Sequence, residues 1–300
     1  MSSSDPQGEL KRFERRHDFF VGIDSDGCAF DTMEIKHKEC FIPNTVKHFG
    51  LQPVARYARE AAEFVNLYSR WRGINRFPAL LMTLDLLRER REVLERDAAI
   101  PHLPATRAWL EHEPKPGNPA LEAAIQTANG EVATELRRVL AWSQAVNKTV
   151  AEIVKGVPPY PFVRESVRRA SERADIIVVS ATPGEALARE WAEHELAHHA
   201  TVIAGQEMGT KAEHLRLAAS GKYPTGRVLM IGDAPGDLAA ARANRALFYP
   251  VNPGSEADSW RRFFDEALER FFEGEYGGEY EAARIAQFEA FLPDTPPWKR

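Results

Sequence analysis

The chain has 300 residues, 44% of them hydrophobic, and a net charge of −5, so it can bury a substantial core and shows no overall attraction to nucleic acid or acidic membranes. Its two cysteines, Cys28 and Cys40, are too few for a disulfide framework. Residues 1–16 lack the apolar stretch of a signal peptide, and no uncharged apolar run approaches the roughly 18 residues that span a bilayer. We therefore expect a cytoplasmic protein without a membrane segment.

The N-terminal part of the chain is predicted to contain a tail, one strand and a large helical insert. Residues 1–17 are polar and are predicted to be disordered, and 18–33 hold an apolar strand over 19–23. From 34 to 157 the strand signals vanish, and Ala, Leu, Arg and Glu recur at helical spacing. We interpret 34–157 as an all-helical domain inserted after the first strand. Helices are expected over 54–71, 79–94, 121–127 and 131–154.

Residues 158–255 alternate between strand and helix patterns. Short β-branched runs predict strands over 176–179, 201–204 and 228–231, each suited to burial on both faces. Helical patterns separate them, over 162–173, 183–199, 211–220 and 237–244. Alternation of this kind predicts an α/β fold with a doubly wound parallel sheet, whose ligand site lies beyond the carboxyl ends of the strands. Residues 256–300 are predicted to form a C-terminal helical extension, split near Gly277-Gly278.

Four polar clusters lie at or near the ends of these predicted elements. Asp24-Ser25-Asp26-Gly27 follows the first strand, and its two carboxylates can take different roles in one reaction, although an acidic turn is an equal alternative. Ser180-Ala181 follows the second strand, where a hydroxyl and backbone N–H groups could bind an anion or simply cap a helix. Lys211 opens a helix, against the helix dipole. Gly232-Asp233 to Asp237 offers two carboxylates on a turn, which suits a hard cation such as magnesium or a helix cap.

Taken together, Asp-x-Asp-Gly, Ser, Lys and Gly-Asp-x-x-x-Asp in this order resemble the four motifs of the haloacid dehalogenase (HAD) superfamily. The resemblance covers the segments around 19–30 and 160–250. It implies a Rossmann-like core fold and membership of the phosphatase branch of the superfamily. The insert matches that family's helical cap in position, between the first and second motifs, but not in any residue. Cys28 and Ala234 replace a Thr and a Ser or Thr that many relatives carry; neither position supplies a required side-chain ligand.

The resemblance also implies roles for single residues. Asp24 would be the nucleophile that forms an aspartyl-phosphate, and Asp26 the general acid and then the base. Ser180 and Ala181 would bind the phosphoryl oxygens, and Lys211 would offset charge between nucleophile and phosphate.

The metal in such a site would be Mg2+. The resemblance implies that Asp24, the backbone carbonyl of Asp26 and the Asp233 carboxylate ligate it, with Asp237 ligating directly or through water. The expected substrate is a small phosphorylated metabolite, with no nucleic-acid or membrane partner; its identity and the oligomeric state stay open.

Two alternatives to a phosphohydrolase remain. A phosphomutase would use the same Asp26, and a binding or regulatory protein could have kept the scaffold without the reaction. Within the insert, Arg70, Arg72, Asn75 and Arg76 cluster between two predicted helices. They could form a substrate-facing loop or, as the commoner case, a solvated connection between helices.

Overall fold

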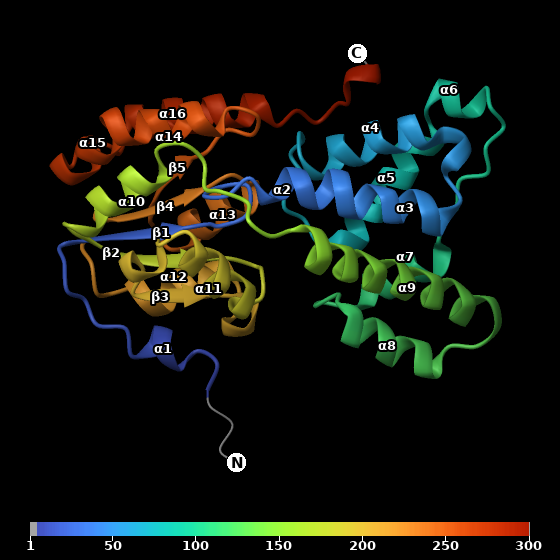
Figure 1. The fold of residues 1–300 in the computed structure, drawn as a ribbon, viewed down its shortest axis with the longest axis horizontal. Coiled ribbons are helices and arrows are strands. Elements are labelled where there is room, and N and C mark those ends of the chain that lie inside the picture. The colour runs from blue at the N-terminus through green and yellow to red at the C-terminus, as the bar shows by residue number, and fades with distance from the viewer. Residues whose placement is uncertain (1–4, 300) are drawn as a thin grey trace. The chain divides into compact units, whose positions relative to one another are not determined.

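The computed structural model describes residues 5–299 and divides the chain into two compact units (Figure 1). One unit comprises residues 5–33 and 156–292, and contains the sheet. The other comprises 34–155 and 293–299, and is helical. An α/β fold with an inserted helical region, predicted from the sequence, is therefore confirmed.

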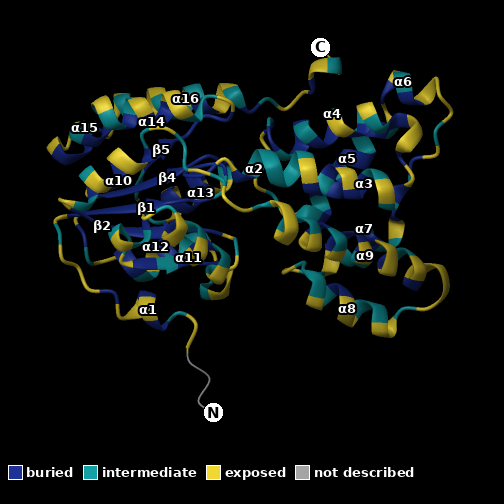
Figure 2. Ribbon diagram, in the orientation of Figure 1, coloured by how far each residue is buried: buried dark blue, intermediate teal, exposed yellow. Residues whose placement is uncertain are grey.

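The first unit is built on five parallel strands in the order β3-β2-β1-β4-β5. The strands are β1 (Phe19–Ile23), β2 (Ala174–Val179), β3 (Val202–Ala204), β4 (Val228–Gly232) and β5 (Leu247–Pro250). Every residue of β1, β2 and β4 is buried (Figure 2), as the continuous apolar runs predict. The fifth strand was not predicted from the sequence.

Helices cover both faces of this sheet, because successive side chains of each strand point to opposite sides. Val21 and Ile176 belong to one apolar cluster, and Phe20 and Ile177 to the other. The first face packs against α10 (Val163–Ser171), α11 (Gly184–Glu193), α14 (Glu256–Arg262) and α15 (Leu268–Glu273). The second packs against α1 (Gly8–Lys11), α12 (Lys211–Ala219), α13 (Pro235–Ala243) and α16 (Glu279–Phe291).

The second unit packs its helices around a large apolar cluster that includes Phe49, Phe77 and Trp142, and a smaller one that includes Phe64 and Val65. Its main elements are the π-helix η1 (Lys36–Phe41), α3 (Ile42–Phe49), α4 (Ala55–Asn66), α5 (Arg76–Arg88), α6 (Arg91–Leu94), α7 (Pro104–His112), α8 (Asn118–Thr127) and α9 (Gly130–Ile153). The short helix α2 (Thr32–Ile35) lies where the chain passes from one unit to the other. No helix in residues 5–299 is both long and apolar enough to cross a membrane. The cytoplasmic location stays a prediction.

The structure differs from the predicted tail at the N-terminus. Met1–Ser4 lie outside the described residues. Over 5–17, however, the chain packs on the sheet unit, with Leu10 and Phe13 buried. The N–H groups of Arg16 and His17 each donate to the Asp175 carboxylate at 2.9 Å. The buried side chains of Leu10 and Phe13 and the carboxylate of Asp175 thus fix this otherwise polar segment on the sheet unit.

The predicted C-terminal extension, 256–300, is also not a separate element. Trp260, Phe263 and Tyr276 are fully buried in the same cluster as the sheet, so residues 256–292 are part of its core unit. Residues 293–299 belong instead to the helical unit, where Trp298 packs against Phe64. The insert itself ends after residue 155, two residues before the predicted boundary.

Candidate active site

The site is built where three neighbouring strands end. Asp24 follows β1, Ser180 follows β2, and Asp233 follows β4. Because β2, β1 and β4 are adjacent and parallel, their carboxyl ends meet at one edge of the sheet. The polar residues that the sequence places far apart are thereby gathered by the topology alone.

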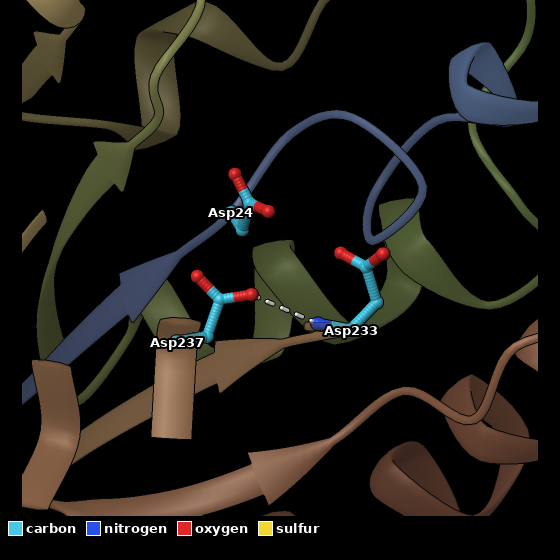
Figure 3. A group of neighbouring side chains, drawn as sticks. All are labelled: Asp24, Asp233 and Asp237. Carbon is cyan, nitrogen blue, oxygen red and sulfur yellow. Dashed lines mark hydrogen bonds between the residues drawn. The ribbon is translucent and has the colours of Figure 1, made fainter. Parts of the chain in front are cut away.

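Three of these carboxylates form a buried cluster, drawn in Figure 3. Asp24, Asp233 and Asp237 each offer an oxygen, and these oxygens all lie within 4.8 Å of one another. The three residues are 4%, 1% and 0% exposed. Carboxylate oxygens are the ligands that hard divalent cations prefer, so the cluster is a candidate metal site.

Lys211 is the positive charge of the cluster. Its Nζ lies 2.8 Å from Asp24 Oδ2 and donates to Asp237 Oδ1 at 2.6 Å. The side chain comes from the first residue of α12, whose start is fixed by a capping box between Thr210 and Glu213. Burial works to lower the pKa of Lys211, but the charges of Asp237 and Asp24 outweigh it and hold that pKa above its ordinary value.

The cluster holds more acidic than basic groups. Three carboxylates lie with one ammonium group in a buried place, so the acidic groups repel one another when they are ionised. Burial raises the pKa of Asp24 well above its ordinary value; Lys211 opposes this shift, and Asp237 and Asp233 add to it. The residues present therefore fit a divalent cation, which would offset this repulsion among the acidic groups.

Asp237 also has a structural task. Its Oδ2 accepts the N–H groups of Asp233 at 3.2 Å and Ala234 at 3.1 Å, and so closes the turn that starts α13. This geometry brings the side chain against Gly232, where a Cβ would lie 2.4 Å from Asp237 Cβ. Asp237 therefore caps α13 and is also part of the acidic cluster. That it binds a metal stays a prediction.

Asp26 is held by two hydroxyl groups. Thr32 Oγ1 donates to its Oδ1 and Thr182 Oγ1 to its Oδ2, both at 2.5 Å. The Asp26 side chain is not one of the clustered acidic ligands, so the two carboxylates of the first motif do occupy different environments. Neither threonine was predicted to have a role, and no spacing signal joins Asp26 to Thr182, which is 156 residues away.

Ser180 lies in a turn and does not cap a helix. Helix α11 begins at Gly184, and the Ser180 Oγ accepts the N–H of Thr182 at 3.2 Å. The Ser180 hydroxyl hydrogen is not used by that bond, and Ala181, beside it, is exposed. A hydroxyl and a turn at a strand end remain a suitable anion site, so the phosphate-binding role of both residues stays a prediction.

Comparisons with known proteins give similar folds at low sequence identity. No family model and no curated protein sequence matches the chain. A haloacid dehalogenase-like hydrolase from Streptococcus pneumoniae is 12% identical over 83% of this chain and 91% of its own, with a TM-score of 0.42. A structure described as a predicted phosphoglycolate phosphatase from Haemophilus somnus is 15% identical over 82% and 90%, with a TM-score of 0.40. A magnesium-bound structure from Bacillus subtilis, whose description names a HAD hydrolase, is 10% identical over 79% and 88%, with a TM-score of 0.42.

Proposed function

We propose that the chain is a magnesium-dependent phosphohydrolase that cleaves a small phosphate monoester through a phosphorylated Asp24. The observation that carries this proposal is the buried cluster in which Lys211 contacts both Asp24 and Asp237, beside Asp233. A nucleophilic carboxylate needs positive charge beside it before a phosphate dianion can approach, and this cluster supplies one ammonium and a fitting cation site.

The first half of the reaction transfers the phosphoryl group. An oxygen of Asp24 attacks phosphorus, and the bond from phosphorus to the ester oxygen breaks. Lys211, already 2.8 Å from Asp24, offsets the repulsion between the carboxylate and the phosphate. Asp26 donates a proton to the leaving oxygen, and the hydroxyl groups of Thr32 and Thr182 hold its carboxyl group in one orientation.

The second half restores the enzyme. Asp26 removes a proton from a water molecule, whose oxygen attacks phosphorus, and the bond from phosphorus to Asp24 breaks to release inorganic phosphate. The Ser180 hydroxyl and the Ala181 N–H bind the phosphoryl oxygens during both halves. Magnesium, held by Asp24, Asp233 and the backbone carbonyl of Asp26, would supply further positive charge beside the phosphoryl group.

A phosphate-release assay tests this function. Purified protein is incubated with an aryl phosphate and with a panel of phosphorylated metabolites, with magnesium and after its removal by a chelator. We expect magnesium-dependent release of inorganic phosphate and a loss of several orders of magnitude in Asp24→Asn, which keeps the size of the side chain and removes its charge. An isomerised product without phosphate release would identify a phosphomutase, and no turnover on any compound would favour a binding role.

A further inference from the structure

Arg76, in the helical unit, is a charged residue whose hydrogen-bond partners among residues 5–299 are all neutral. Arg76 is one of the arginines that the sequence places between two helices, and the structure separates their roles. Arg70 pairs with Asp294 at 2.9 Å, and Arg72 is buried and donates to the carbonyl of Leu67. Arg76 is partly buried, and among residues 5–299 it has no carboxylate within ion-pairing distance.

The contacts of Arg76 fix one part of the guanidinium. Its Nη1 donates to Asn147 Oδ1 at 2.6 Å and to Ser143 Oγ at 3.0 Å, one turn apart on α9. The guanidinium carbon lies 5.0 Å from the ring centre of Phe41, so the plane rests near an aromatic ring. Ser143 is itself fixed, because its hydroxyl donates to Asn118 at 2.6 Å. The arginine is therefore held in place by neutral groups alone.

The position of Arg76 lowers the stability of the folded chain, for two reasons. Burial lowers the pKa of Arg76, because no nearby negative charge offsets the loss of water around it. Arg76 is also the first residue of α5, where the helix dipole favours negative charge. Arg88, the last residue of the same helix, has the opposite situation, since it pairs with Asp85 and lies at the favourable end.

We propose that Arg76 is the anion-binding residue of a site in the helical unit, for a ligand that carries a carboxylate or phosphate group. Only Nη1 is engaged by Ser143 and Asn147, so Nε and Nη2 can bind two oxygens of one anion side by side. Planar, paired recognition of this kind needs arginine and is lost in lysine. The ligand replaces the counter-charge that the protein does not provide.

Nuclear magnetic resonance of the full chain tests this inference independently of turnover. The Nε–H signal of Arg76 is assigned as the one that Arg76→Lys removes, and is followed during titration with inorganic phosphate, with acetate, and with chloride at equal ionic strength. We expect a saturable shift with phosphate, with acetate or with both, and none with chloride. A response to one anion alone identifies a phosphoryl or a carboxylate group as the source.

Amide signals of Ser143 and Asn147 give a second readout. In Arg76→Lys, we expect the anion affinity reported by these amides to fall at least tenfold, whereas the control Arg88→Lys changes it less than twofold. An Arg76 signal that responds to neither oxyanion, or responds equally to chloride, overturns the inference. Anion affinity at these amides that is unchanged in Arg76→Lys also overturns it. The proposed reaction at Asp24 stands or falls separately, because neither readout requires catalysis.

Discussion

Replacing Gly232 with alanine perturbs the acidic cluster without removing any charged group. The new Cβ would lie 2.4 Å from Asp237 Cβ and 2.5 Å from its Cγ and Oδ2. Carbon atoms in contact prefer about 3.5 Å, so Asp237 has to retreat by about 1 Å. Its bonds from the N–H groups of Asp233 and Ala234, now 3.2 and 3.1 Å, would then exceed hydrogen-bonding distance.

The expected loss of stability follows from these contacts. Forced overpacking costs about 1–3 kcal/mol, and two hydrogen bonds to a charged acceptor cost about 1.5–3 kcal/mol each when broken. Because Asp237 can relax in part, we expect the free energy of unfolding of Gly232→Ala to fall by about 3–5 kcal/mol. Displacing Asp237 also disturbs Lys211, so magnesium affinity should fall.

Urea denaturation measures the first effect and calorimetric magnesium titration the second. Gly236→Ala is the matched control, four residues along the same motif, because a Cβ there would meet nothing within 4 Å. We expect this control to be neutral or slightly stabilising, since alanine favours a helix more than glycine does. If Gly232→Ala kept wild-type stability and magnesium affinity, or if both variants lost equally, close packing of Asp237 on Gly232 would not be what limits this position.

Three further predictions concern single side chains. Asp233→Ala should weaken magnesium binding, whereas Asp26→Ala should leave magnesium binding largely intact and slow turnover. Calorimetry and kinetics on both variants separate these roles. Unchanged magnesium affinity in Asp233→Ala would show that Asp233 is not a metal ligand. Burial lowers the pKa of His214 to about 4 in the folded chain. Between about pH 6.5 and pH 4, His214 is therefore protonated in the unfolded chain but not in the folded one, and the free energy of unfolding should fall by about 3 kcal/mol as the pH is lowered through this range. In denaturation at several pH values, His214→Leu should lose this contribution and the exposed control His112→Leu should keep it; identical slopes would contradict the assignment. Asp175→Asn should lower the free energy of unfolding by about 2 kcal/mol, because Asp175 accepts two backbone N–H groups and a tyrosine hydroxyl, and unchanged stability would show that this anchor contributes little.

Much of the sheet could be predicted because burial leaves a clear pattern in the sequence. The runs at 19–23, 176–179 and 228–231 are apolar on both faces, and each forms a strand whose carboxyl end carries a polar residue. Leu247–Pro250 lacks β-branched residues and ends in proline, so its pairing with β4 shows only in three dimensions. The helices at 42–49 and 104–112 were missed for a related reason, since each has proline in its first turn, where it is tolerated.

The charged residues of the site could be predicted, because Asp24 and Asp233 directly follow strands, and Lys211 and Asp237 lie in the first turn of a helix. The structure brings these four residues together. The hydrogen bond from Thr182 to Asp26 depends on the approach of the segment after β2 to the segment after β1. No local sequence pattern encodes this approach. The missing counter-charge of Arg76 is likewise invisible in a sequence that is rich in acidic residues.

Chemical trapping of the phosphorylated nucleophile tests the proposed function most directly. An aspartyl-phosphate is reduced by borohydride to homoserine, so the enzyme is quenched during turnover with magnesium and an aryl phosphate, reduced, and analysed by peptide mass spectrometry. We expect homoserine at position 24 and unmodified aspartate at position 26, with no conversion when substrate is omitted. Phosphate release at a normal rate without homoserine at position 24 would show that Asp24 is not the nucleophile.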